Sequence, residues 1–440
     1  MSLLERYLPI ADLYWEGDTF RPAIDAAGPA ELAERLARIE GQFSLAVATE
    51  SGVMLARDKH GVNKLFYAIR EDGSVIAANY IADLVDRGVP FSAVFSVPSG
   101  RLTHVEPHAA RLSHTRYYEL PSPSGEGIEH GAREIREALE TWFARMAASL
   151  RGRPIRLCLS GGLDSSVIAA LAVRHFPDVT AYTYSFIGHD NSLSEDAVYA
   201  RRVAERLGLG LELVLASADT FAQVVESALV WGQDWRDFNV HCAVVNEILA
   251  RAMADDAPAP RPLVLTGDMM NEIVADYTPI GFAGTEYYKL PRLEPERLRR
   301  ILVRGLDAGD REVGVFARHG LDLVQPYGMV LDHYMRVPLT RLGEGGKQRL
   351  VREVAGDLLP AFVLERKKVR AQIGTSAEPT GILPEFARLG WDSHWLAATW
   401  CRRFNIQDSS ALAGFIRGGV YRTPSAYPSE GPVERGYLTR

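Results

Sequence analysis

Residues 160–166 read Ser-Gly-Gly-Leu-Asp-Ser-Ser, a combination of side chains that suits a phosphate-bearing ligand. Adjacent glycines let the backbone approach an anion closely, serine hydroxyls donate hydrogen bonds, and a following helix adds the positive end of its dipole. Asp164 would repel the anion unless a metal ion stood between them, so the motif also predicts Mg²⁺. The alternative is a glycine-serine turn that joins a strand to a helix and binds nothing.

Two other families of reactive loop fit this motif less well. A Walker A loop requires a lysine before its final Ser or Thr, and none occurs here. A nucleophile elbow requires glycines two residues before and two residues after its serine, and Ser160 does not have that spacing. Binding of a pyrophosphate group remains the best interpretation of the loop.

The elements around the motif alternate between strand and helix, which predicts a parallel sheet covered by helices on both faces. A strand at 155–159 leads straight into the motif, and a helix at 165–175 follows it. Further strands are expected at 179–186, 211–215 and 263–266, and further helices at 195–207, 221–231, 240–253, 298–306 and 348–354. Beyond residue 266 the chain is expected to be mainly helical.

The first 120 residues have a different pattern, with short apolar runs separated by turn residues. Strands are expected at 43–48, 52–56, 65–69 and 75–78, with one short helix at 31–40. The Pro, Ser and Gly residues around 121–127 predict a linker. The expected organisation is therefore a β-rich domain at 1–120, a linker at 121–127 and an α/β domain at 128–440.

Composition excludes several classes of protein. The 440 residues are 47% hydrophobic and 24% charged, and no apolar run reaches the length of a membrane span. A net charge of -7 gives no general reason to bind nucleic acid. Three widely spaced cysteines argue against a zinc ribbon or a disulfide framework. We expect a cytoplasmic protein that acts on small molecules, without nucleic-acid or membrane partners, and with a homodimer as one option.

The S-G-G-x-D-S string after a strand resembles the fingerprint of the PP-loop ATP pyrophosphatases, and within them the asparagine synthetases and β-lactam synthetases. Later blocks follow in the order that this family shows: TYSFIGHDNSLSEDAVYARRVAERLGL at 183–209, LTGDMMNEIVADY at 265–277, QPYGMVLDHY at 325–334 and LPAFVLERKKVRAQIGTS at 359–376. The resemblance implies ATP and Mg²⁺ as cofactors and a doubly wound parallel sheet of PP-loop type with extra helices.

The resemblance also implies roles for individual residues. Lys368 would stabilise the oxyanion and the leaving phosphate, with Lys367 as the alternative. Asp164, Asn271 and Glu272 would hold the metal, although Asn271 is neutral where the family has an aspartate. The residues expected around ATP and pyrophosphate are Leu159, Ser160, Gly161, Gly162, Asp164, Ser165, Ser166, Ser185 and Gly267.

The N-terminal blocks GQFSLAV at 41–47, LARDKHGVNKLFYA at 55–68 and VIAAN at 75–79 resemble part of a class II glutaminase domain of the Ntn type. That class uses an N-terminal cysteine as its nucleophile. Here the first residues are Met1 and Ser2, and the first cysteine is Cys158. We therefore expect a truncated glutaminase-like domain without glutaminase activity, with Ser2 as a remote alternative nucleophile.

The family resemblance points to an AMP-forming amide synthetase that adenylates a carboxylic acid and transfers the acyl group to an amine. In β-lactam-forming relatives a tyrosine pairs with a distant glutamate to deprotonate the amine, whereas Asp268 occupies that tyrosine position and Glu312 is the candidate glutamate. A carboxylate pair can act as a base if one pKa is raised. We therefore expect intermolecular joining in natural-product biosynthesis. The alternatives are β-lactam or macrolactam closure and a degenerate nucleotide-binding regulatory protein.

Overall fold

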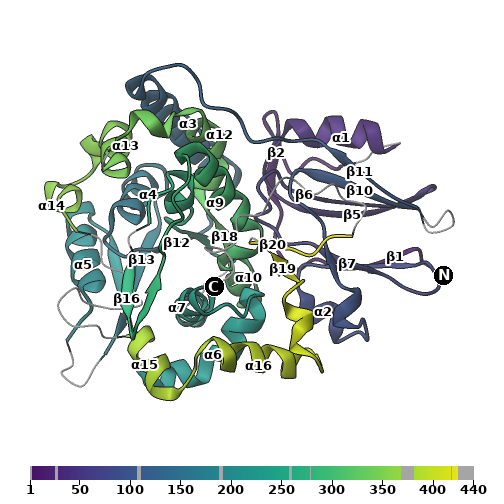
Figure 1. The fold of residues 1–440 in the computed structure, drawn as a ribbon. Coiled ribbons are helices and arrows are strands. Elements are labelled where there is room, and N and C mark those ends of the chain that lie inside the picture. Colours follow the sequence, from purple (N-terminus) through teal and green to yellow (C-terminus); the bar gives the residue numbers. More distant parts are fainter. Residues whose placement is uncertain are drawn as a thin grey trace.

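The computed structural model describes residues 2–24, 28–106, 111–187, 192–256, 260–277, 279–343, 345–367, 381–417 and 419–424. Two parts lie side by side, a β-rich part that ends near Arg116 and an α/β part that begins at Ile128 (Figure 1). The segment predicted as a linker runs between them without regular structure and is held by the α/β part, because the amide of Ser124 donates to the carbonyl of Arg336 at 2.7 Å.

The β-rich part contains two four-stranded sheets and a smaller three-stranded one, in the orders β1-β8-β7-β9, β11-β10-β6-β5 and β3-β2-β4. The strands are β1 Leu4–Tyr7, β2 Leu13–Glu16, β3 Thr19–Phe20, β4 Ile39–Gln42, β5 Ser44–Thr49, β6 Gly52–Arg57, β7 Phe66–Ile69, β8 Val75–Ala78, β9 Phe95–Ser96, β10 Arg101–Glu106 and β11 Arg111–Arg116. The helices are α1 Pro29–Arg38 and α2 Ile81–Val85.

Alternating side chains divide this part into layers. In β6, Val53 and Leu55 point into a core between the two larger sheets, whereas Met54 and Ala56 face the other way and pack beneath helix α1. The four strands and the helix that the sequence predicts in this region are confirmed to within two residues at either end.

The α/β part is built on a five-stranded parallel sheet in the order β14-β13-β12-β15-β18, which confirms the predicted α/β class. Its strands are β12 Ile155–Cys158, β13 Val179–Phe186, β14 Gly210–Ala216, β15 Leu263–Leu265 and β18 Asp322–Val324. Successive residues alternate between two cores, since Leu263 and Leu265 face one side and Val264 faces the other. The sheet is therefore buried on both faces.

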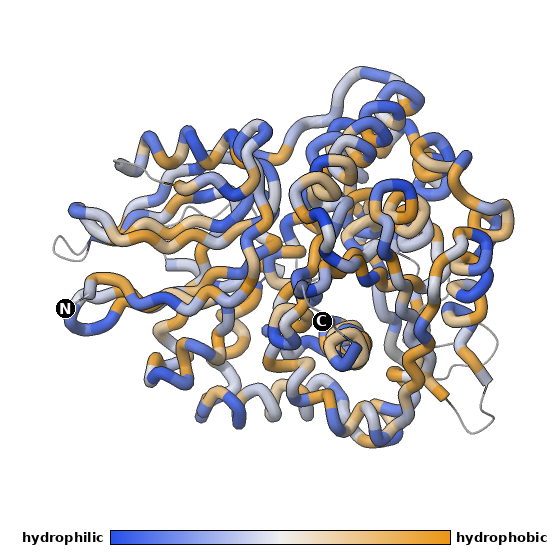
Figure 2. Tube along the Cα trace, turned by 180° about the vertical axis from the view of Figure 1, so that it is seen from behind, coloured by the Kyte–Doolittle hydropathy of each residue, from blue (hydrophilic) through white to orange (hydrophobic). Residues whose placement is uncertain are grey.

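Helices cover both faces of this sheet, with α3, α4, α5 and α13 on one side and α6, α7 and α10 on the other (Figure 1). Figure 2 shows hydrophobic and hydrophilic residues interleaved along the helical segments, as expected where one helix face packs on a sheet and the other faces water. The helices of the α/β part are α3 Ile128–Ser149, α4 Leu163–His175, α5 Glu195–Leu207, α6 Ala218–Gly232, α7 Asp237–Asp255, α8 Met270–Ile273, α9 Pro295–Gly309, α10 Glu312–Arg318, α11 Pro326–Met329, α12 Leu331–Arg336, α13 Gly346–Ala355, α14 Ala361–Leu364, α15 Ile382–Leu389 and α16 Ser393–Arg403.

The expectation of a mainly helical chain after residue 266 is confirmed, but the sequence analysis did not predict β18, which completes the sheet. Two hairpins also lie in this region, formed by β16 Ile280–Phe282 with β17 Thr285–Tyr287 and by β19 Ile416–Arg417 with β20 Val420–Tyr421. Each of these strands has three residues or fewer, too few for a repeating pattern to be visible in the sequence.

The two parts share a core and a buried ionic network. Phe66 and Tyr80 of the β-rich part pack in the same cluster as the helices on one face of the parallel sheet. Arg57 is completely buried and donates to Asp307 at the end of α9 at 2.6 Å. Lys64, also buried, donates to the carbonyls of Leu306 and Asp307. The β-rich part is therefore packed into the structure of the α/β part.

In the described part of the chain, no helix combines the length and the hydropathy required to cross a bilayer.

We expect Arg57→Met to lower the free energy of unfolding by about 3–5 kcal/mol, because removal of one partner of a buried ion pair leaves the other charge uncompensated. Urea unfolding followed by circular dichroism measures the change. Arg388→Met is the matched control, since Arg388 is 59% exposed in its pair with Glu385, and we expect it to cost less than about 1 kcal/mol. Equal midpoints for the two variants would contradict the role given to Arg57.

Candidate active site

The order of the parallel strands places a ligand site at one edge of the sheet. From β12 the chain adds β13 and β14 on one side, and it then returns to add β15 and β18 on the other side of β12. β12 and β15 are therefore parallel neighbours in the sheet although they are far apart in sequence. In open α/β sheets ligands bind beyond the carboxyl ends of the strands at such a switch point. The predicted phosphate loop at 160–166 follows β12. The start of the block at 265–277 follows β15 and is called the second loop below, so both loops meet at this point.

The first loop packs directly against helix α5 because Gly161 has no side chain. Gly161 has φ of +66°, and a Cβ at this position would lie 2.3 Å from the backbone nitrogen of Ala200. Within the loop, the amide of Ser160 donates to Oγ of Ser165 at 3.2 Å and the amide of Gly162 donates to Oγ of Ser160 at 3.3 Å. The loop is thus a compact turn whose amides and hydroxyls gather at the start of α4.

The second loop touches the first through Gly267. A Cβ at Gly267 would lie 2.6 Å from the backbone nitrogen of Ser165 and 2.9 Å from the carbonyl carbon of Asp164. Only glycine permits this approach of two backbones. A contact from the other side fixes the first loop, since the buried hydroxyl of Tyr327 donates to the carbonyl of Asp164 at 2.9 Å.

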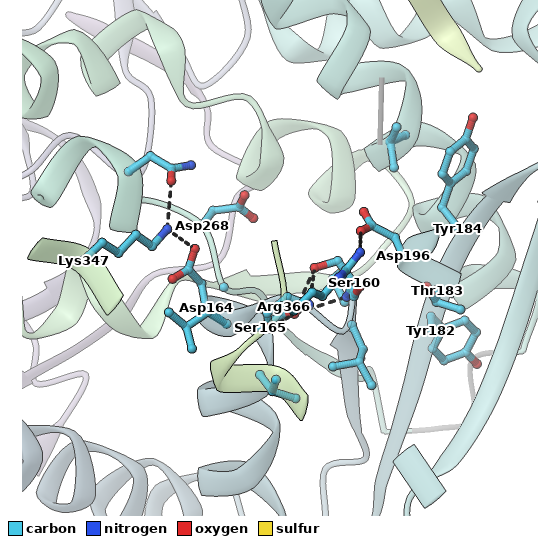
Figure 3. Close-up of a pocket in the computed structure, with 18 of the residues that line it drawn as sticks. Ser160, Asp164, Ser165, Tyr182, Thr183, Tyr184, Asp196, Asp268, Lys347 and Arg366 are labelled. Carbon is cyan, nitrogen blue, oxygen red and sulfur yellow. Dashed lines mark hydrogen bonds and ion pairs between the residues drawn. The ribbon is translucent and has the colours of Figure 1, made fainter. Parts of the chain in front are cut away.

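The two loops form one wall of a cavity of about 350 Å³, and strand β13, helices α5, α7 and α13 and the segment 363–367 complete it (Figure 3). Its lining includes eight of the sequence-predicted site residues: Leu159, Ser160, Gly162, Asp164, Ser165, Gly267, Asp268 and Asn271. Tyr182, Thr183 and Tyr184 lie on the opposite wall, as Figure 3 shows.

Other predicted residues lie elsewhere. Gly161 and Ser166 support the loop from behind, and Ser166 is fully buried. Ser185 is also fully buried and accepts a hydrogen bond from the amide of Ser194 at 2.9 Å, which connects β13 to the start of α5. Lys368 falls outside the described residues, whereas the neighbouring Lys367 is exposed and lines the cavity.

Lys347 is the residue at the centre of the site that the sequence analysis missed. Its Nζ donates to Oδ2 of Asp164 and, at 2.9 Å, to Oδ1 of Asn271 (Figure 3). It therefore lies between two of the predicted metal ligands. A signal was available in the sequence, because Lys347 occupies the apolar face of α13, in the same helical register as Leu350, Val351 and Val354. A lysine at such a position is buried only with a partner.

Arg366 links the first loop to helix α5. Its guanidinium donates to the carbonyl of Ser160 at 3.0 Å and pairs with Asp196 at 2.5 Å, while its Cζ lies 4.2 Å from the ring centre of Tyr199. Only 5% of the Arg366 side chain is exposed. This arginine adds a fixed positive charge beside the loop.

A second cavity of about 180 Å³ adjoins the first, and Asp268 and Asn271 line both. Glu312 and Glu272 lie in the second cavity, where Glu272 accepts a hydrogen bond from Tyr277. The rings of Tyr277 and Tyr288 stack there with their centres 5.6 Å apart. Phe238 lines this cavity as well, whereas its sequence neighbours Trp231 and Trp235 pack in the hydrophobic core.

The second cavity contains an acidic cluster that includes Asp310, which sequence reasoning did not single out. Nε2 of Gln325 donates to Asp310 at 3.1 Å and to Glu312 at 3.3 Å. Glu312 also pairs with Arg311 at 2.9 Å. Both carboxylates are almost fully buried, at 3% exposure.

The environment of these carboxylates separates their pKa values. Burial, reinforced by the charge of Glu312, raises the pKa of Asp268 to about 7. Burial and a hydrogen bond with Glu312 raise the pKa of Asp310 well above its usual range. Burial alone would raise the pKa of Glu312 too, but the attraction of Arg311 and a hydrogen bond from Asp310 outweigh it and lower that pKa. Asp268 is thus the group poised to exchange a proton near neutral pH.

The arrangement combines two chemical capacities in two adjoining cavities. The first cavity offers backbone amides, serine hydroxyls and fixed cations to an anion. The second offers a carboxylate that titrates near pH 7 beside an ionised glutamate. A reaction that joins groups bound in the two cavities would take place at Asp268 and Asn271, which both cavities share.

Comparison with known proteins gives the family context. A family model described as asparagine synthase matches residues 134–312, which include both loops. The glutamine-hydrolysing asparagine synthetase of Homo sapiens is 24% identical over 370 residues, which cover 76% of this chain and 64% of that enzyme. The enzyme of Cricetulus griseus is 24% identical over 415 residues, which cover 86% of this chain and 71% of that enzyme. The match to the human enzyme thus spans less than two thirds of its length.

Among solved structures, an NMN synthetase from Francisella tularensis covers 62% of this chain and 91% of its own, with 16% identity and a TM-score of 0.31. An NH₃-dependent NAD synthetase from Campylobacter jejuni covers 54% of this chain and 99% of its own, with 16% identity and a TM-score of 0.25. Together with the family model, the curated relatives identify the α/β part: the chain contains an asparagine synthase domain and is homologous to the asparagine synthetases.

Proposed function

We propose that this protein is an ATP-dependent amide synthetase that adenylates a carboxylic acid and transfers the acyl group to an amine, with release of pyrophosphate and AMP. The observation that carries the proposal is the convergence of both loops, with Asp164, Lys347 and Arg366, on one cavity at the switch point of the sheet. The match of residues 134–312 to the asparagine synthase model supports the same reaction class.

The cavity suggests an orientation for the nucleotide. Its phosphates would lie on the loop of Ser160 and Ser165, where they would take over donors that now bond within the loop, the amides of Ser160 and Gly162. The base would lie toward β13, whose residues Tyr182 to Tyr184 form the opposite wall. Gly267 lines the cavity as well, in contact with the first loop.

Two covalent steps follow from this orientation. The carboxylate oxygen attacks the α-phosphorus of ATP, and the bond from that phosphorus to the bridging oxygen breaks, so that pyrophosphate leaves with the electron pair. The amine nitrogen then attacks the acyl carbon and expels AMP, while its proton passes to a base. The first step converts a poor leaving group into a good one, and the fixed cations stabilise the charge that develops on the phosphates.

A divalent cation fits the first cavity. Three cations and four carboxylates line it: Lys347, Arg366 and Lys367 against Asp164, Asp196, Asp268 and Asp276. A triphosphate would add further negative charge, so Mg²⁺ would supply the missing compensation. Oδ1 of Asp164 is buried without a hydrogen-bond partner among the described residues and could act as a ligand. Oδ1 of Asn271 accepts a hydrogen bond from Lys347 at 2.9 Å.

We further propose that Asp268 is the base for the amine, with Glu312 holding its pKa near neutrality. Lys368, carried over from the family resemblance, would stabilise the oxyanion of the acyl transfer. A base made of carboxylates, in place of the tyrosine of ring-closing relatives, favours an external amine, and natural-product biosynthesis is the expected context. The β-rich part contains no cysteine. The hydroxyl of Ser2 is exposed and donates to the carbonyl of Leu4. We therefore propose that the β-rich part does not hydrolyse glutamine.

One observation favours a second candidate, a nucleotide-binding protein without turnover. Lys347 pairs with Oδ2 of Asp164 and donates to Oδ1 of Asn271, so its ammonium group already lies between two of the proposed metal ligands. In such a protein ATP would bind and remain intact.

ATP–pyrophosphate exchange with a panel of carboxylic acids tests the proposal. We expect incorporation of labelled pyrophosphate into ATP that depends on Mg²⁺ and on one class of acid, and formation of AMP when an amine is added. Mass spectrometry of the product then distinguishes joining of two molecules from ring closure. Formation of ADP would overturn the mechanism, and nucleotide binding without any exchange would favour the second candidate.

The Asp164→Asn variant should lose at least about 100-fold in exchange rate, because it removes the carboxylate that holds both Lys347 and the proposed metal. Circular dichroism should show an unchanged fold. Asp178→Asn is the matched control, since Asp178 is exposed and lies outside the cavity. If both variants retain full exchange, Asp164 has no part in the reaction.

The rate of amide formation should rise with pH through about 7, because Asp268 is protonated below its raised pKa and accepts a proton only above it. Single-turnover measurements from a preformed acyl-adenylate isolate this step. Asp268→Asn should remove the pH-dependent limb and slow the step by about 10²–10⁴-fold, while the rate of pyrophosphate exchange changes little. If the rate of amide formation still rises with pH in the variant, a group other than Asp268 accepts the proton of the amine.

A further inference from the structure

The second cavity lies where an amine would approach the acyl-adenylate, because Asp268 and Asn271 line both this cavity and the nucleotide cavity. Its volume is about 180 Å³. Sites for drug-sized ligands usually enclose about 300–1,000 Å³. The amine that enters the second cavity is therefore small.

Acidic side chains outnumber basic ones in the lining of the second cavity. Four carboxyl groups face two guanidinium groups, namely Asp268, Glu272, Asp310 and Glu312 against Arg236 and Arg311. Arg311 already pairs with Glu312 at 2.9 Å, and Arg236 pairs at 2.6 Å with Asp234, which lies outside the lining. A substrate carboxylate would have to compete with these partners, whereas a cationic substrate would meet Asp268 and Glu272.

An unsatisfied acceptor in the same lining calls for a donor in the ligand. Gln325 is 1% exposed, and its Nε2 donates to Asp310 and Glu312. The oxygen of the same amide, Oε1, is buried without a hydrogen-bond partner among the described residues. A buried carbonyl without a donor is unfavourable. Because Gln325 lines the cavity, an N–H group of a bound amine can supply the missing donor.

Aromatic rings form another part of the lining. The rings of Tyr277 and Tyr288 stack with 7° between their planes, and the ring of Phe238 meets that of Tyr288 edge-on at 6.2 Å. The hydroxyl of Tyr277 donates to Glu272, a residue that lines the second cavity and not the first. Ring faces and a carboxylate both attract an alkylammonium group. This wall therefore suits a positive charge that stays on the substrate.

We propose that the second cavity selects a small amine that carries a second, cationic amino group and no carboxylate, that is, a short aliphatic diamine. The attacking nitrogen would lie at Asp268 and the oxygen of Gln325. The distal ammonium group would lie against Glu272 and the two tyrosine rings. The role of the diamine as acceptor rests on the proposed amide synthesis, whereas its binding requires no turnover.

The acyl transfer balances with such a substrate. The attacking nitrogen enters as a neutral amine and forms a bond to the acyl carbon, while the bond from that carbon to the phosphate oxygen breaks and AMP leaves with the electron pair. One proton passes from the attacking nitrogen to Asp268. The distal ammonium group keeps its proton, so it offsets the charge of Glu272 throughout the step.

Isothermal titration of the full chain with three amines of similar length tests the proposal. The amines are diaminobutane, pentylamine, in which a methyl group replaces the second ammonium group, and γ-aminobutyrate, in which a carboxylate replaces it. We expect diaminobutane to bind at least about tenfold more tightly than pentylamine, because hydrogen bonds between charged groups are stronger than neutral contacts. γ-Aminobutyrate should bind most weakly, because its carboxylate would meet like charge.

Glu272→Gln should lower the preference for diaminobutane over pentylamine about tenfold, because it removes the charge and keeps an oxygen that can accept from Tyr277. Glu286→Gln is the matched control, since Glu286 is exposed, pairs with Lys289 and lies outside the cavity. Tyr288→Leu removes one ring of the wall and should also lower the preference, which provides a second test if Glu272→Gln unfolds.

Equal binding of diaminobutane and pentylamine would refute the diamine site, as would a preference that Glu272→Gln leaves unaltered. Two further outcomes separate the diamine site from the proposed reaction. Selective binding of diaminobutane without pyrophosphate exchange retains the site and rejects the synthetase. Pyrophosphate exchange without that selectivity retains the synthetase and rejects the site.

Discussion

The close approach of Gly267 to the backbone of Asp164 and Ser165 is the constraint on which the candidate active site depends. Two loops that follow neighbouring parallel strands come within contact distance only because no side chain stands between them. This contact brings Asp164 and Asp268 into the lining of one cavity. It also explains why the loops form a single site instead of two separate turns.

Charge pairing then shapes the cavity that these loops form. Lys347 binds Asp164 and Arg366 binds Asp196, so each fixed cation beside the phosphate loop has an acidic partner. A phosphate group entering the cavity must compete with these carboxylates for the same cations. A divalent cation would resolve the competition by binding carboxylate and phosphate together, which is the physical reason for the proposed metal.

The β-rich part is tied to the α/β part by more than a linker. Arg57 and Lys64 reach the carboxyl end of α9, just before the acidic residues Asp310 and Glu312. Positive side chains at that end of a helix complement its dipole as well as the carboxylate of Asp307. The β-rich part therefore has a structural role, because it holds the carboxyl end of α9 in place.

The sequence by itself determined the α/β class, most strands and helices, and the position of the phosphate loop. These features depend on local periodicity and on a motif whose residues are contiguous. It did not reveal β18, which has too few residues to show a period, or the exclusion of Ser185 from the cavity. Tertiary structure alone brought Lys347 to Asp164, and Gln325 to Asp310 and Glu312, because such pairings depend on how segments distant in the sequence pack together. Whether a charged side chain meets a partner is decided by that packing, since local sequence sets which face of an element a residue occupies but not what lies opposite.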